Sequence, residues 1–124
     1  MKFVLETTHR YWWPVKVRIP DPEAAGKIIE QTLKIQFEPK GRDEALASDE
    51  VYQNLTTAKD RADHEQKQLM DVCKGWDDVV GSDKSAVAFT EENFRLALQH
   101  SWFRTAVYQA YAESLNGQEA RLGN

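Results

Sequence analysis

The chain has 124 residues, of which 41% are hydrophobic and 29% are charged, and its formal net charge is −4. This length and balance predict one folded domain over residues 1–124 and argue against a disordered chain or a membrane-spanning protein. The acidic charge disfavours nucleic acid as a partner, because a negative field repels phosphate backbones. The opening residues, MKFVLETTHR, reach a glutamate too early for a signal-peptide core, so we expect a cytoplasmic protein.

Residues 1–40 have the composition and spacing of β-strands. Residues 2–20 are rich in Val, Ile, Thr, Tyr and Trp, and we predict two strands there. The first covers about residues 3–11, and a turn or bulge follows near residues 12–14. In the second, three apolar residues alternate with Lys16 and Arg18, so one face is apolar and the other cationic. A third strand, predicted over residues 28–38, could pair antiparallel with residues 15–19.

Residues 42–75 have the periodicity of one long helix that ends at Gly75. Steps of three and four residues place its apolar side chains on one face. These positions are Val51, Leu55, Ala58, Ala62, Leu69, Val72 and Trp76. The middle of the helix, residues 59–68, is almost wholly polar, so we expect it to project into solvent or to meet a partner. Cys73, the only cysteine, lies in this pattern and is expected to be a buried structural thiol.

A loop over residues 76–89 is predicted to lead into a helix or helix pair over residues 90–117. Thr90 precedes two glutamates and is the expected N-cap, while Phe89 and Phe94 have the spacing of a hydrophobic staple. The apolar stripe that follows is Phe94, Leu98, Trp102, Ala106, Val107, Ala110, Tyr111 and Leu115. Ser101 could cap a second helix, so one kinked helix and two helices both stay open. Gly117 is the expected stop, before a loose tail over residues 118–124.

Together these elements predict an α+β fold in which a small antiparallel N-terminal sheet of about three strands packs against three to four C-terminal helices. The phosphate-loop, dinucleotide, zinc-protease and hydrolase motifs are not present in the sequence, and the three histidines lie in separate elements. We therefore expect no enzyme, no cofactor and no metal site. An aromatic and basic platform at residues 11–18 could stack single-stranded bases, or it could divide between the core and a solvated stripe.

Several short motifs follow one another in a recognisable order. They are W-P-V-x-V-x-x-P at residues 13–20, R-D-E at 42–44, K-G-W at 74–76, an apolar-F-[ST]-E-E-N helix start at 88–93, and a closing A-R-x-x-N at 120–124. In this order the chain resembles the tail assembly chaperones encoded by long-tailed bacteriophages and prophages, over nearly its whole length. The shared residues are packing and turn residues, with no catalytic signature among them.

The resemblance implies a non-enzymatic chaperone in the cytoplasm of the bacterial host, which binds the tape measure protein and helps recruit tail tube subunits. Its client-binding surface is expected on the later helices, because large apolar side chains are dense there. The candidate lining is Phe94, Leu98, Trp102, Tyr108 and Tyr111, although each could instead be core. Two alternatives are a structural tail or head-completion component of the virion and a small nucleic-acid-binding regulator. The sequence leaves a homo-oligomer open.

Overall fold

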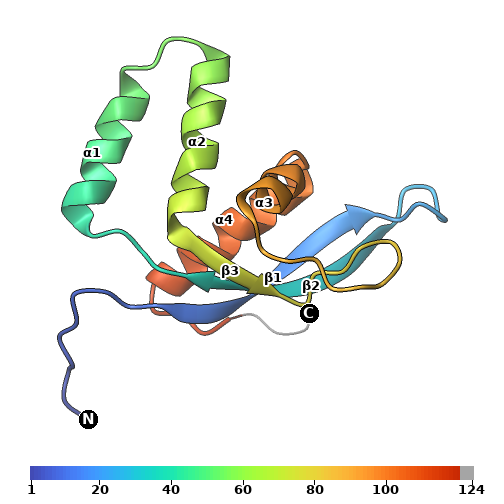
Figure 1. Cartoon of the computed structure of the whole chain (residues 1–124), viewed down its shortest axis with the longest axis horizontal. Helices are drawn as coiled ribbons and strands as arrows, with labels where there is room; N and C mark the ends of the chain where they lie inside the picture. Colours follow the sequence, from blue (N-terminus) through green and yellow to red (C-terminus); the bar gives the residue numbers. More distant parts are fainter. Residues whose placement is uncertain (121–124) are drawn as a thin grey trace.

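Three antiparallel strands form the sheet on which the rest of the chain packs. The computed structural model describes residues 1–120 and contains β1 (Tyr11–Pro20), β2 (Ile28–Phe37) and β3 (Cys73–Asp77), in the order β1-β2-β3 (Figure 1). β1 and β2 pair over their whole length, with Val15 opposite Leu33, so the predicted pairing of residues 15–19 with the strand at 28–38 is confirmed. Residues 121–124, with most of the closing A-R-x-x-N, lie outside the described residues.

The start of the sheet differs from the prediction. A strand over residues 3–11 and a turn or bulge over residues 12–14 are both wrong, because β1 runs without interruption from Tyr11. Residues 1–10 have a β-rich composition, but no strand within residues 1–120 lies beside them to supply hydrogen bonds. Pro14 is accommodated because β1 is an edge strand, and one side of an edge strand makes no ladder hydrogen bonds.

The third strand, β3, forms where the sequence predicted the end of a helix. Its Trp76 lies opposite Ile35 in β2, and Gly75 lies opposite Gln36. The ring of Trp12 lies over Gly75, where a Cβ would stand 3.7 Å from it, an ordinary van der Waals distance. Gly75 thus lies inside a paired strand, and its prediction as a helix stop is wrong.

The single helix predicted over residues 42–75 is also wrong, because the segment folds as two helices, α1 (Arg42–Gln53) and α2 (Ala58–Val72). Thr57 starts α2, where its side-chain oxygen accepts a hydrogen bond from the backbone N–H of Asp60 at 3.1 Å. This cap and the C-cap at Asn54 interrupt the periodic run. α1 contains no buried residue, and the α1–α2 hairpin stands away from the sheet (Figure 1).

The last segment forms two helices, α3 (Glu91–Leu98) and α4 (Ser101–Leu115), which decides between the two open alternatives. Thr90 caps α3 as predicted, with its hydroxyl oxygen 3.0 Å from the backbone nitrogen of Asn93. Ser101 is the first residue of α4, and the cap position belongs to His100, whose side chain makes no cap hydrogen bond. Gly117 has a φ of 66°, the left-handed conformation expected after a helix.

One hydrophobic core fills the space between the sheet and helices α2, α3 and α4, and the predicted α+β class is confirmed. The core residues are Val15, Val17, Leu33, Ile35, Phe37, Leu69, Val72, Cys73, Phe94, Leu98, Phe103, Ala106, Val107 and Ala110. The predicted stripe is wrong at Trp102, which is 36% exposed, whereas Phe103 is buried. The break between α3 and α4 shifts the phase of the second helix, so Phe103 faces the sheet instead.

Helix α4 is fastened to the first strand by two side-chain hydrogen bonds. The hydroxyl of Tyr11 lies 2.7 Å from Oγ of Ser114, and the indole N–H of Trp13 donates to Oε1 of Glu113 at 3.1 Å. The ring of Tyr111 also packs 5.2 Å from the ring of Phe37 on β2. These contacts set the rotation of α4 about its own axis. They therefore decide which of its side chains stay exposed to a possible partner.

Leu98 and Leu96 lie on the same helix, α3, but are 2% and 61% exposed. We predict that Leu98→Ala lowers the free energy of unfolding by about 3–5 kcal/mol, because it removes buried methyl groups and leaves a cavity. Leu96→Ala is the matched control and should change that free energy by less than about 0.5 kcal/mol. Urea unfolding measures both. Equally small effects would show that Leu98 lies outside the core.

Cys73 is 2% exposed, as expected of a structural thiol, and burial raises its pKa to about 12 from an ordinary 9.0. The unfolded chain therefore releases this proton at lower pH than the folded chain does. We predict that the thiol lowers the free energy of unfolding progressively from pH 9 to pH 12. Chemical unfolding across this range should show a steeper fall for the native chain than for Cys73→Ala. Parallel curves would contradict the prediction.

Candidate functional site

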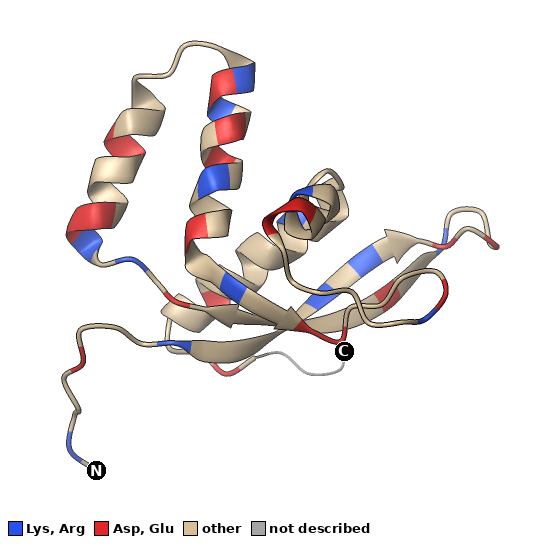
Figure 2. Cartoon of the chain, viewed as in Figure 1, with Lys and Arg blue, Asp and Glu red and all other residues tan. Residues whose placement is uncertain are grey.

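An open groove of about 390 Å³ lies between α1, α2 and α4, and we call it the α1–α4 groove. It is lined by Lys40, Arg42, Ala45, Leu46, Ser48, Asp49, Gln68, Leu69, Val72, Tyr108, Tyr111 and Leu115. The charged residues of this set come from α1 and the chain just before it. The floor is apolar and aromatic. Figure 2 shows the same contrast, with charges spread along α1 and α2 while α4 is largely free of them.

Helical spacing explains why these side chains meet. Leu69 and Val72 are three residues apart on α2, and Tyr108 and Tyr111 are three apart on α4, so each pair shares one face of its helix. Leu46 forms the facing wall from α1 and is 58% exposed, while Tyr108 is 39% exposed. Burial raises the pKa of both tyrosines, so their hydroxyls stay protonated at neutral pH. The α4 side of the groove therefore offers an uncharged, partly solvated surface to a partner.

The wall formed by α1 is held to α2 by polar side chains, which we call the polar cluster: Ser48, His64 and Gln68. Nε2 of His64 lies 2.9 Å from the carbonyl oxygen of Ser48, and Nε2 of Gln68 lies 2.7 Å from the same ring nitrogen. Near the tip of the hairpin, the guanidinium of Arg61 lies 5.6 Å from the ring centre of Tyr52. Each such contact contributes little net free energy and α1 buries no residue, so we expect α1 to open locally more readily than the other helices.

The polar cluster brings a serine and a histidine together without making a nucleophile. Oγ of Ser48 is 3.4 Å from Nε2 of His64, yet the same nitrogen lies 2.9 Å from a carbonyl oxygen. The amide nitrogen of Gln68, at 2.7 Å, is also nearer to this ring nitrogen, so the hydroxyl is the most distant of its three polar neighbours. The cluster is therefore a packing contact between two helices.

The predicted lining residues fall in three different places. Tyr108 and Tyr111 line the α1–α4 groove, and the other three predicted residues do not. Phe94 and Leu98 are 0% and 2% exposed and belong to the core, which removes them from any contact surface. Trp102 lines a separate hollow at the far end of the sheet, where its ring stacks on that of His100 with centres 4.9 Å apart.

Sequence reasoning missed the half of the groove that α1 and α2 supply, including Leu46 and Leu69. A single helix over residues 42–75 would carry these two side chains far apart along its length, whereas the hairpin brings them together. The signal that could have revealed the hairpin is the spacing of Thr57 and Asp60, an N-cap with an acidic first turn.

The aromatic and basic platform proposed for residues 11–18 is divided by the sheet. Tyr11 and Trp13 bond to α4, whereas Trp12 extends over Gly75 on the opposite face and is 49% exposed. Three aromatic rings are therefore not presented together to a single strand of bases. Within residues 1–120, no three His, Cys, Asp or Glu side chains are placed to hold a metal ion.

None of the described helices is both long and apolar enough to cross a membrane. No protein-family model matches the chain, and no curated protein or solved structure matches it significantly.

Proposed function

We propose that this chain is a non-enzymatic tail assembly chaperone of a long-tailed bacteriophage or prophage. The observation that carries the proposal is the open α1–α4 groove, whose floor is apolar and whose α1 wall is only lightly attached. The order of short motifs along the sequence adds the family context. A chaperone of this kind holds a client by surface contact, and such a surface needs no catalytic group.

The client that suits this groove is an amphipathic helix of the tape measure protein. Helix-in-groove recognition places apolar side chains at helical spacing against a hydrophobic floor between flanking helices. Leu46, Tyr108 and Leu115 are 58%, 39% and 52% exposed, so they lose solvent contact when a helix docks. That loss supplies the driving force for binding. The movable α1 then adjusts the width of the groove to successive client segments.

The charged outer surface complements this role. The chain carries a net charge of −4, and acidic and basic residues occur along both helices of the α1–α2 hairpin (Figure 2). A charged exterior keeps a complex soluble while its apolar contact is covered. In this proposal the chaperone acts in the cytoplasm of the bacterial host, keeps the long client helices soluble, and helps bring tail tube subunits to them.

The test is co-expression with a tape measure protein encoded beside this chain. Leu46 and Val51 both lie on α1 and are 58% and 52% exposed, but only Leu46 lines the groove. We predict that Leu46→Asp weakens client binding roughly tenfold or more, because it places a carboxylate in an apolar contact. The measurement is the soluble, co-purifying fraction of the client.

Val51→Asp introduces the same charge on the same helix and should leave that fraction unchanged. Equal loss from both variants would place the contact elsewhere on α1. A client that is equally insoluble with and without the native chain would refute the proposal. Stoichiometric recovery of the chain from purified virions would favour the structural tail or head-completion role instead.

A further inference from the structure

The free edge of β1 carries backbone groups that bond to no other strand among residues 1–120. Just beyond β1, the N–H of Asp21 donates to the carbonyl of Lys27 at 2.8 Å, which marks Asp21 as a bonded position of the β1–β2 ladder. Bonded positions alternate along an antiparallel pair, so the odd-numbered residues of β1 face β2. The N–H and C=O groups of its even-numbered residues therefore point away from the sheet, where they offer a template for a further strand.

Space for such a strand lies between β1 and α4. Val15 and Val17 are buried in the core, whereas the side chains of Lys16 and Arg18 alternate with them on the other face. An open groove of about 810 Å³ is lined by these two cations and by residues of α4 that include two alanines. Because β2 occupies the other side of β1, this groove follows the free edge.

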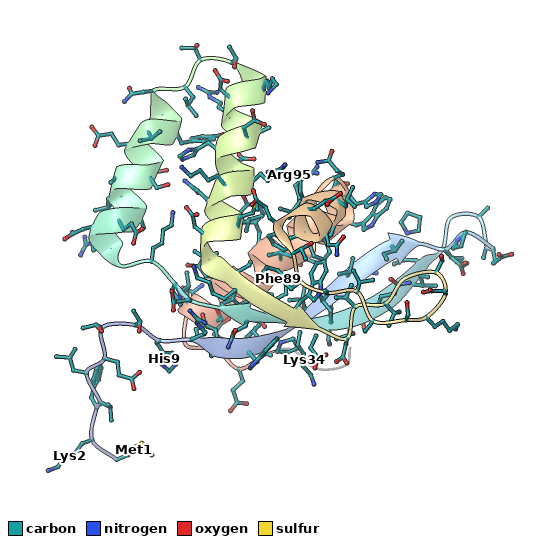
Figure 3. The ribbon with its side chains drawn as sticks, viewed as in Figure 1. Met1, Lys2, His9, Lys34, Phe89 and Arg95 are labelled. Carbon is teal, nitrogen blue, oxygen red and sulfur yellow. The ribbon has the colours of Figure 1, made fainter. Side chains whose placement is uncertain are left out.

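Residues 1–10 form an arm that has the composition of a strand, but no strand lies beside it among residues 1–120. Its residues Phe3, Val4 and Leu5 are 80%, 71% and 90% exposed. A folded protein normally covers a run of large apolar side chains like this one. Figure 3 shows His9 where the arm joins β1 and the first two residues at its far end. The arm is thus a strand without a partner, on the same chain as an edge without one.

The charges of the arm and of the edge match in one antiparallel register. If Glu6 lies opposite Lys16, residues 2–8 of the arm lie opposite residues 14–20 of β1 in reverse order. The Glu6 carboxylate then shares a face with Lys16 and is diagonal to Arg18, within reach of both. Among the described residues Arg18 has no ion-pair partner. The charge match therefore agrees with the alternation of side chains along both strands.

The same register matches the apolar side chains of the arm. Alternate residues of a strand share a face, so Phe3 and Leu5 lie on the face opposite to that of the glutamate. They stand across from Ile19 and Val17 of β1, which face the core. On this side the groove is lined by small side chains of α4, which leave room for two large ones.

Other antiparallel registers lose one of these two matches. A shift by one residue turns Glu6 towards α4 and the apolar side chains towards the cations. A shift by two residues either places Lys2 opposite Arg18, a like-charge pair, or carries Phe3 beyond the end of β1 at Pro20. Only the register described above satisfies charge and packing together.

The arm of the same copy cannot take this position. In the matching register Thr8 lies beside Pro14, which is three residues into β1 from Tyr11. The three residues from Thr8 to Tyr11 span at most about 11 Å. The path from Tyr11 along β1 to Pro14 already takes about 10 Å, with about 4.8 Å more between the strands. No chain remains to make the turn, so the arm has to come from a second copy.

We infer that the chain forms a reciprocal dimer in which residues 2–8 of each copy add as a strand to the β1 edge of the other. The two identical contacts close about a two-fold axis that passes beside Tyr11 of each copy. The pair between Glu6 and His9 is given up, but both side chains are more than half exposed, so its loss costs little. The α1–α4 groove takes no part, so the dimer and the proposed function can fail separately.

Charge reversal tests the register in analytical ultracentrifugation of the full chain. Glu6→Lys and Lys16→Glu each oppose like charges at both contacts of the dimer, and each should raise the dissociation constant about tenfold. An equal mixture of the two variants should recover the native constant, because in the mixed dimer each arm meets an edge of opposite charge. Only exchange between copies predicts this recovery.

The two adjacent threonines of the arm give a matched test of the backbone contact. In the proposed register the N–H of Thr8 donates to the carbonyl of Pro14, whereas the N–H of Thr7 points away from β1. Thr8→Pro removes one hydrogen bond from each contact and should weaken the dimer about tenfold. Thr7→Pro removes none and should leave the dissociation constant unchanged, because proline is tolerated where the backbone nitrogen faces solvent.

Three results would overturn the inference. A native chain that stays monomeric at high micromolar concentration would show that the arm and the edge do not meet. A native dimer that ignores both charge reversals would place the contact on another surface. A dimer weakened equally by Thr7→Pro and Thr8→Pro would show that the arm does not pair with β1 in this register.

Discussion

The packing of α4 on the first two strands is the contact on which the rest of the structure depends. Val107 of α4 and Val15, Ile35 and Phe37 of the sheet have no exposed surface, and each such side chain contributes about 1.5–3 kcal/mol on burial. The side-chain hydrogen bonds of Tyr11 and Trp13 with α4 then fix the rotation of this helix about its own axis. Because one face of α4 is committed to the sheet, the neighbouring face with Tyr108 is left as the floor of a groove.

Helix α1 has no comparable anchor, and the proposed function depends on this difference. α2 continues directly into β3 and is thereby tied to the sheet, whereas α1 buries none of its residues and meets α2 through Ser48, His64 and Gln68. One side of the groove is therefore formed by helices that pack into the core, and the other by a helix that buries none of its residues, which we expect to open more readily. A rigid floor gives a binding surface without an ordering cost, and a movable wall accommodates helices of different width.

Local signals in the sequence predicted local structure well. The cap at Thr90, the turn at Gly117 and the alternation in β2 each depend on neighbouring residues, and the structure confirms all three. The errors concern segments whose structure depends on residues far away in the sequence. Residues 3–11 have strand composition without a paired strand, β3 exists only because β2 lies beside it, and the phase of α4 follows from the break that exposes Trp102. The α4 side of the groove was predicted, because Tyr108 and Tyr111 lie in the later helices where the client-binding surface was expected. The other side was missed, because it forms only when residues 42–72 fold back as the α1–α2 hairpin.

Hydrogen exchange followed by mass spectrometry tests the central claim most directly, since it reports the stability of each helix separately. The chain should be measured at a concentration where it is monomeric. The account predicts that amides of α1 exchange through local opening, much faster than those of α4, and that occupation of the groove slows exchange in α1 selectively. Protection of α1 equal to that of α4 in the empty monomer would contradict it, because α1 would then be as firmly packed as the core.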